Sequence, residues 1–163
     1  MVRITPLDPA SERGSFDSGV EALDRYFRER VSQDIRRRVT TCFVARDRHD
    51  RIAGFYTLSA TSVLLADLPQ ETARKLPRYP TVPAVRMGRL AVDRSARGKG
   101  LGAALLADAL ARCLDADIAS FALVVDAKDE AAAAFYRHHG FIPFEDRPRI
   151  LFLPLATARS ALR

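Results

Sequence analysis

The sequence predicts a single α/β domain in which a mixed β-sheet carries helices on both faces. Strand-like and helix-like segments alternate along the chain, which is the pattern of a layered α/β fold. The length of 163 residues suits one domain spanning residues 1–163. Hydrophobic residues make up 48% and charged residues 28%, as in an ordinary globular protein, and no repeat interrupts them.

The N-terminal part of the chain predicts a strand, a helix and a hairpin. Residues 4–7 are typical of a short strand. Apolar residues recur at helical spacing over 20–35, so we expect a helix that breaks or bends before Arg38. The β-branched and aromatic runs 40–45 and 52–60 flank a polar turn, which predicts an antiparallel hairpin.

The middle of the chain is marked by prolines. A short helix is expected over 68–76. Pro77, Pro80 and Pro83 follow it, and because proline cannot donate a hydrogen bond within a central strand, they predict an extended loop. The next strand is expected over 85–92.

The C-terminal part predicts two further helices and three strands. A glycine-rich turn at 98–102 opens the first of these helices, and an apolar strand is expected over 121–125. Asp129 is a suitable cap for the second helix, which Gly140 terminates. The packed face of this second helix is predicted to carry Ala131, Ala134, Phe135 and His138. The runs 141–144 and 150–155 predict the last two strands.

The turn between the strand over 85–92 and the following helix has the composition of an anion-binding site. Gly98, Gly100 and Gly102 let backbone N–H groups converge without obstruction by Cβ atoms, and a helix N-terminus adds partial positive charge. Arg97 and Lys99 add full charges. The turn lacks the Ser or Thr of a Walker A loop and the spacing of a dinucleotide fingerprint. A tight turn with solvated charges is the alternative.

The segment Arg97-Gly98-Lys99-Gly100-Leu101-Gly102 resembles the (Arg/Gln)-x-x-Gly-x-(Gly/Ala) signature of the GNAT N-acetyltransferases. The resemblance implies the GNAT fold, with a largely antiparallel mixed sheet, and acetyl-CoA as cofactor. It implies that this turn binds the pyrophosphate through main-chain N–H groups. It also implies that the preceding strand binds the pantetheine arm at Leu90, Ala91 and Val92.

A second motif, Ala-x-x-Phe-Tyr followed by Gly-Phe, resembles the C-terminal part of the same family. It adds Asp126 and Phe135 as candidate cofactor-binding residues, although Phe135 is also suited to packing. Tyr136 is the candidate catalytic residue, since a phenol with a pKa near 10 can protonate a departing thiolate whose thiol pKa is about 8.5. A tyrosine that only packs against the cofactor is the alternative.

Nearly the whole chain resembles the GNAT toxins of bacterial type II toxin–antitoxin systems, through segments that include Phe16–Gly19, Gly54–Ser59, Leu76–Pro80 and Met87–Asp93. That resemblance implies acetylation of the α-amino group of aminoacyl-tRNA, which blocks translation. It also implies a ribbon-helix-helix antitoxin and is compatible with a homodimer. No carboxylate is spaced as a general base, which suits an α-amino acceptor that sheds its proton more easily than a lysine.

The formal net charge of +6 favours an anionic partner. The candidate substrate-binding residues are Arg36, Arg37, Arg38, Arg74, Lys75, Arg78 and Arg89. Arg89 is expected to face either the acceptor site or a structural carboxylate. Phe55, Tyr56 and Tyr79 are candidates to stack on a terminal base, with core packing as the alternative.

Other interpretations are an N-acetyltransferase for a small molecule or a protein, and a non-enzymatic acyl-CoA sensor. Cys42 and Cys113 are expected to be buried thiols, and no metal site is expected. No long apolar stretch or signal peptide is evident, which predicts a cytoplasmic protein.

Overall fold

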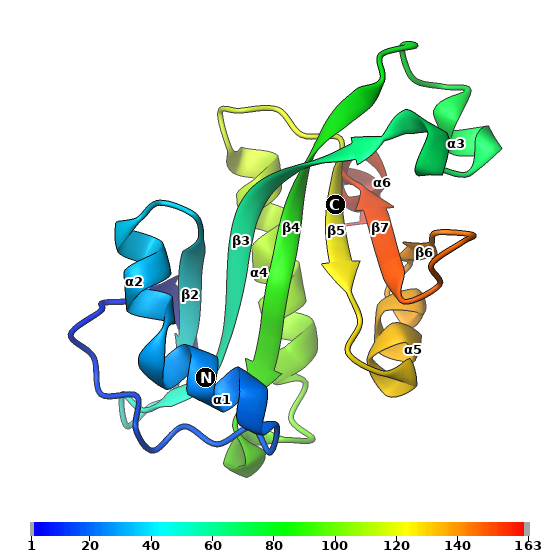
Figure 1. The fold of residues 1–163 in the computed structure, drawn as a ribbon. Helices are drawn as coiled ribbons and strands as arrows, with labels where there is room; N and C mark the ends of the chain where they lie inside the picture. Colours follow the sequence, from blue (N-terminus) through cyan, green and yellow to red (C-terminus); the bar gives the residue numbers. More distant parts are fainter. Residues whose placement is uncertain (1, 162–163) are drawn as a thin grey trace. The chain divides into compact units, whose positions relative to one another are not determined.

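The computed structural model describes residues 2–161 and shows a mixed α/β fold (Figure 1). In chain order, its elements are β1 Arg3–Pro6, α1 Glu21–Glu29, α2 Val31–Arg36, β2 Thr41–Arg46, β3 Ile52–Leu64, η1 Leu65–Asp67, α3 Gln70–Ala73, β4 Thr81–Val92, η2 Arg94–Ala96, α4 Leu101–Asp115, β5 Ala122–Asp126, α5 Glu130–His138, β6 Ile142–Pro143, β7 Ile150–Pro154 and α6 Leu155–Ala161. The strand order within the sheet is β1-β2-β3-β4-β5-β7-β6. The predicted fold class is confirmed.

Two compact units make up the chain. Unit 1 comprises residues 1–59 and 88–109, and unit 2 comprises residues 60–87 and 110–163. The strands β3 and β4 and the helix α4 each contribute residues to both units.

Unit 1 has helices on both faces of its strands. β2 pairs antiparallel with β1 and with β3, which confirms the predicted hairpin. Successive residues of a strand point to opposite faces. On one face of β3, the Phe55 ring stacks on Phe27 of α1 with centroids 4.2 Å apart. On the other face, a Cβ at Gly54 would lie 2.9 Å from Leu105 of α4, so glycine is required there for α4 to approach.

Unit 2 is built around β5. The first half of β4 pairs parallel with β5, from Ala84↔Ala122 to Met87↔Val125, and β7 pairs antiparallel on the other side. The core of unit 2 includes Val82, Val124, Phe144 and Phe152. α6 begins directly after β7 and buries Ala158. The sequence analysis did not predict this helix, although Pro154 at the end of the strand was an available signal for the end of the strand and the start of a helix.

The structure corrects the prediction for the proline-rich loop. Pro83 lies within β4, which begins at Thr81. Its carbonyl accepts a hydrogen bond from the amide of Phe121 at 2.8 Å. Because the N–H and C=O of one strand residue point to the same side, the N–H that proline lacks would also point toward β5. Pro83 precedes the first paired residue, Ala84, and its ring therefore displaces no hydrogen bond of the β4–β5 ladder.

Two helix predictions also need correction. The helix expected over 20–35 is broken at Arg30, whose backbone leaves the helical region at φ −120°; no glycine or proline marks this position. In α5, the buried side chains are Ala133 and Tyr136, whereas the predicted face of Ala131, Ala134 and His138 is exposed. Alanine at each position from 131 to 134 gives no hydrophobic contrast from which the face could be recognised.

Candidate functional site

The end of β4 is held in place by a half-buried acidic cap. Asp93 follows the strand, and its carboxylate accepts hydrogen bonds from the amides of Ser95 at 3.0 Å and Asp17 at 2.9 Å. Burial alone would raise the pKa of Asp93, but these hydrogen bonds outweigh it and lower the pKa below its ordinary value. The carboxylate therefore stays ionised and connects the turn after β4 to the loop around Asp17.

The glycine-rich turn presents unobstructed backbone. Gly98 and Gly100 have φ values of +76° and +77°, and no atom lies within 4 Å of a Cβ built at either position. Within the described part of the chain, no hydrogen bond is found for the amides of residues 98–103, and the first helical bond is donated by Ala104 to the Gly100 carbonyl at 3.1 Å. These amides precede or open the 15-residue helix α4. The residues present therefore fit a phosphate group.

The charged residues near this turn differ in whether their side chains are already bound within the protein or remain available to a ligand. The Arg97 guanidinium donates to the carbonyl of Ser18, and Arg94 lies 3.2 Å from Asp17. Arg97 thus fastens the turn to the loop at 17–19. Lys99 is exposed, and no ion pair is found for it among residues 2–161. Leu101 is buried at 6% exposure, so only its backbone is available to a ligand.

The strand residues before the turn alternate in burial. Ala91 is buried, whereas Leu90 and Val92 are half-buried. The backbone of this segment runs close to β3, since the Asp93 amide donates to the Ala53 carbonyl at 2.8 Å. Leu90–Val92 and the glycine-rich turn both belong to unit 1.

Arg89 lies on an aromatic ring. Its guanidinium carbon is 3.4 Å from the ring centroid of Tyr26, and the Tyr26 hydroxyl donates to Asp34 at 2.8 Å. Burial and then the Asp34 hydrogen bond raise the pKa of Tyr26, so this phenol stays protonated. Arg89 is therefore positioned by a cation–π contact with Tyr26, whose hydroxyl in turn hydrogen-bonds to Asp34.

Both predicted basic clusters are exposed. Arg36, Arg37 and Arg38 lie at the end of α2, where Arg38 has φ +59° and occupies the left-handed position of a Schellman cap, with Val39 donating to Asp34 at 3.1 Å. Arg74, Lys75 and Arg78 follow α3. No ion pair is found for any of these six side chains within the described residues. The first cluster belongs to unit 1 and the second to unit 2.

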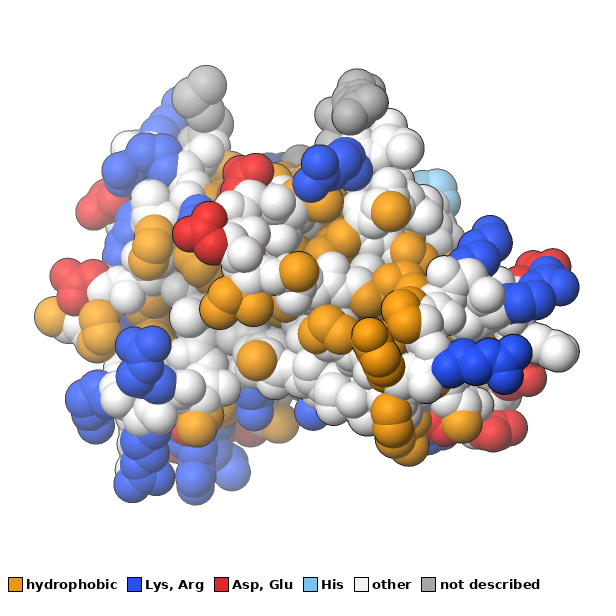
Figure 2. All heavy atoms as spheres, turned by 90° about the horizontal axis from the view of Figure 1, so that it is seen from above, with side chains coloured by type: hydrophobic (Ala, Val, Ile, Leu, Met, Phe, Trp, Pro, Cys, Tyr) orange, Lys and Arg blue, Asp and Glu red, His pale blue; other side chains and the backbone are white. Residues whose placement is uncertain are grey.

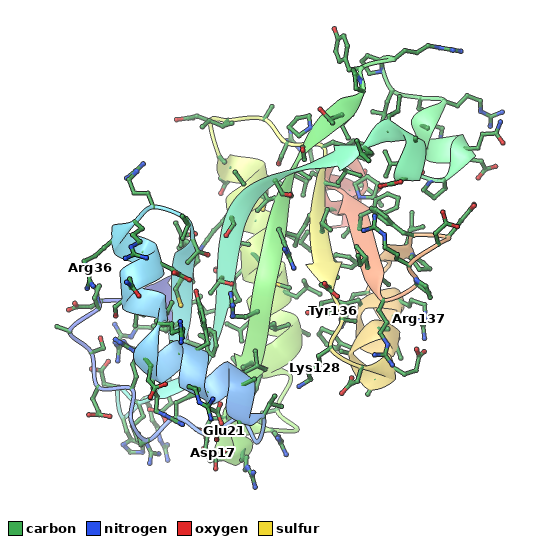
Figure 3. All side chains as sticks on the ribbon, in the orientation of Figure 1. Asp17, Glu21, Arg36, Lys128, Tyr136 and Arg137 are labelled. Atoms are coloured by element: carbon green, nitrogen blue, oxygen red, sulfur yellow. The ribbon has the colours of Figure 1, made fainter. Side chains whose placement is uncertain are left out.

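Tyr136 is a buried residue of α5 (Figure 3). It is 7% exposed, and its ring contacts Phe141, with centroids 5.5 Å apart, and the half-buried Phe135 at 5.3 Å. No hydrogen bond to its hydroxyl is found among the residues that the structure describes. Burial raises the pKa of Tyr136 above its ordinary value, so the phenol keeps its proton at neutral pH.

Unit 2 contains a cavity of about 450 Å³ that the sequence analysis did not predict. Its walls carry two ion pairs, Arg86–Asp126 at 3.6 Å and Arg147–Asp67 at 3.2 Å. Val63, Val124, Phe144 and Ile150 provide apolar lining. Of these residues, the sequence analysis had selected only Asp126. The others come from segments far apart in the sequence. The one available signal for this cavity was Arg86, which lies at an exposed position in the alternating burial pattern of β4.

Two further features concern the described residues as a whole. They contain no group of three or more His, Cys, Asp or Glu side chains that could hold a metal ion. None of the described helices is both long and apolar enough to cross a membrane.

Comparisons with known proteins agree with this geometry. Residues 9–141 match the model of the acetyltransferase (GNAT) family. The chain is 38% identical over 158 residues to a tRNA-acetylating toxin of Mycobacterium tuberculosis, covering 96% of this chain and 93% of the relative. It is 31% identical over 170 residues to a probable toxin TacT of Sinorhizobium fredii, with 98% and 94% covered.

Solved structures are similar over the same length. AtaT complexed with acetyl-methionyl-tRNAfMet is 28% identical, with a TM-score of 0.88 and 100% of both chains covered. AtaTR bound with AcCoA is 30% identical, with a TM-score of 0.82 and coverage of 99% of this chain and 98% of that one. The chain therefore belongs to the GNAT family and is an acetyltransferase whose acyl donor is acetyl-CoA.

Proposed function

We propose that this protein is the toxin of a type II toxin–antitoxin system and acetylates the α-amino group of aminoacyl-tRNA, which blocks translation. The observation that carries the proposal is the full-length similarity to a tRNA-acetylating toxin, at 38% identity. The structure of AtaT with acetyl-methionyl-tRNAfMet supports the same substrate class. Residues 1–163 then act as one catalytic domain, in the cytoplasm, where charged tRNA is present.

The cofactor is held mainly by backbone groups. The amides of 98–103 bind the pyrophosphate, with Lys99 adding charge, and the backbone at Leu90–Val92 binds the pantetheine arm. This assignment is supported by the unpartnered amides and by the open space around Gly98 and Gly100. Arg97 contributes by fixing the turn to Ser18. When bound, acetyl-CoA supplies an activated acetyl thioester.

Tyr136 is the general acid of the transfer. The acceptor nitrogen forms its bond to the acetyl carbon as the carbon–sulfur bond breaks, and the Tyr136 hydroxyl gives a proton to the departing sulfur. The raised pKa keeps the phenol protonated until the thiolate forms, and no hydrogen-bond partner for its hydroxyl is found among residues 2–161. The proton released by the acceptor nitrogen passes to water, which also reprotonates the phenol. An α-amino group near pKa 8 needs no dedicated base.

The basic clusters provide affinity for the tRNA backbone. The side chains of Arg36–Arg38 and of Arg74, Lys75 and Arg78 are exposed and unneutralised within the described chain, as contacts to phosphate require. Arg89 adds a cation held on Tyr26. Such contacts are independent of sequence and weaken with salt.

A protein antitoxin is the expected partner. AtaT has been solved bound to the C-terminus of the antitoxin AtaR, and a KacTA complex has been solved with DNA. By analogy we propose a ribbon-helix-helix antitoxin for this chain, and a homodimer as its assembly.

Transfer of labelled acetyl groups to charged tRNA tests the proposal. Purified protein with labelled acetyl-CoA is expected to label aminoacyl-tRNA. The same tRNA should stay unlabelled when its amino acid has been removed by hydrolysis before the reaction. Label on polyamines or peptides but never on charged tRNA would support the small-molecule or protein acetyltransferase instead. Acetyl-CoA binding without transfer to any acceptor would support the sensor interpretation.

A further inference from the structure

Tyr79 is a large aromatic side chain exposed on the surface. It is 66% exposed and lies in the loop between α3 and β4, whereas Phe55 and Tyr56 are fully buried. Of the three aromatic residues considered for base stacking, Tyr79 alone is accessible. Leu64, at the end of β3, is also 53% exposed.

The loop that carries Tyr79 is constrained. Pro77 and Pro80 flank the residue on both sides and fix two φ angles. The Leu65 amide donates to the Pro80 carbonyl at 3.0 Å, which ties the loop to the end of β3. No ring contact is found for Tyr79 within the described residues, so its ring is not used for packing. An aromatic ring held outward on a constrained loop loses little conformational entropy on binding.

Three basic residues precede Tyr79 in the sequence. Arg78 precedes it, and Arg74 and Lys75 end the helical turn before the loop; all three are exposed. The acidic residues of this segment are Glu71, which is exposed, and Asp67, which pairs with Arg147 at 3.2 Å. On the face shown in Figure 2, hydrophobic side chains gather beside Lys and Arg side chains on the right, the side on which α3 lies in Figure 1. An exposed ring next to excess cations matches a nucleic acid better than an acidic peptide, since each unpaired base offers a flat face beside a phosphate.

We propose that Tyr79 stacks on an unpaired base of the 3′ end of tRNA, while Arg74, Lys75 and Arg78 bind the adjacent phosphates. The inference rests on the proposed function and specifies which part of the substrate this surface binds. A single-stranded end is required because bases inside a duplex are already stacked on their neighbours.

A tryptophan probe tests the stacking directly. The chain contains no tryptophan, so Tyr79→Trp introduces a single indole fluorophore. The ligand is an uncharged RNA hairpin with an acceptor-type stem and a single-stranded 3′ end, compared with the same stem closed to a blunt end. We expect the overhang RNA to quench the indole fluorescence of the Tyr79→Trp variant and the blunt stem to leave it nearly unchanged. Ile118→Trp, at an 85% exposed site in another loop of unit 2, is the matched control and should not respond to either RNA.

Affinity provides the second measurement. Tyr79→Ala should raise the Kd for the overhang RNA about tenfold, whereas Tyr79→Phe should stay within about twofold. Because the side chain is exposed, the Tm of both variants should match that of the wild type. Equal quenching by both RNAs, or an unchanged Kd in Tyr79→Ala, would overturn the stacking.

Two other outcomes separate this inference from its alternatives. Quenching of the Tyr79→Trp variant by an antitoxin but not by RNA would assign the surface to a protein partner and equally overturn the stacking. If the wild type acetylates charged tRNA while the introduced indole does not respond to RNA, only this inference fails. Quenching by the overhang RNA without acetylation of charged tRNA would refute the proposed function alone.

Discussion

Replacing Tyr136 with phenylalanine removes one oxygen atom and leaves the packing of α5 intact. The ring keeps its contacts with Phe141 and Phe135, and the hydroxyl makes no hydrogen bond within the described chain. No hydrogen bond worth about 0.5–1.5 kcal/mol is therefore lost from the protein, so the free energy of unfolding should change by less than about 0.5 kcal/mol. Loss of the proposed general acid should lower kcat about 10²–10⁴-fold, which raises the barrier by about 3–5 kcal/mol.

The assay is steady-state acetyl transfer to charged tRNA, with calorimetric titration of acetyl-CoA alongside. The affinity for acetyl-CoA should be unchanged, because the proposed contacts to its phosphates come from another segment. Since burial raises the pKa of Tyr136, the phenol stays protonated up to its ordinary pKa of 10 and beyond, and activity should not fall at alkaline pH through this group. Instead, kcat/KM should rise with pH through the pKa of the acceptor amine, which the adjacent ester lowers below the ordinary α-amino value near 8.

Tyr26→Phe is the matched control for this variant. It removes a hydroxyl that donates to Asp34 at 2.8 Å, so it should destabilise the fold by about 1.5–3 kcal/mol, the usual value for a hydrogen bond to a charged group. Its kcat should fall far less than that of Tyr136→Phe. A Tyr136→Phe enzyme with wild-type turnover, or one in which kcat falls only in proportion to a loss of folded protein, would remove Tyr136 from the chemistry.

Three further predictions concern the glycine-rich turn, the run Arg36–Arg38 and the two thiols. Gly100→Val should weaken acetyl-CoA binding measured by calorimetry, because a branched residue at φ +77° strains the turn and crowds its open side; normal affinity would contradict the phosphate cradle. Replacing Arg36–Arg38 by alanine should reduce the slope of log K for tRNA binding against log salt concentration by up to about three units. Arg159→Ala on α6 is the control and should leave this slope unchanged. An unchanged slope in the triple variant would show that the run is solvated surface that does not contact tRNA. Burial raises the pKa of Cys42 to about 12 and that of Cys113 to about 11. At pH 8, maleimide should therefore label the thiols of the unfolded protein but not those of the folded protein. Rapid labelling of the folded protein would refute this burial.

Features encoded by consecutive residues were predictable from the sequence. The glycine-rich turn and the helix after it follow from backbone requirements that glycine alone satisfies easily, and both Gly98 and Gly100 do adopt positive φ. The Asp129 cap is confirmed, with its side chain accepting from the Ala132 amide at 2.8 Å. The positive φ of Gly140 likewise agrees with its predicted role in ending α5. In each case the determining atoms lie within a few residues of one another.

Features that depend on distant residues required the tertiary structure. The sequence could not show that Arg89 lies on Tyr26, since that contact joins β4 to α1. Nor could it show the cavity whose ion pairs join Arg86 to Asp126 and Arg147 to Asp67. Local sequence determined the conformation of the glycine-rich turn because backbone preference acts over one turn of chain. Packing between strands and helices determined which side chains became buried, paired or exposed, because those contacts exist only after distant segments have come together.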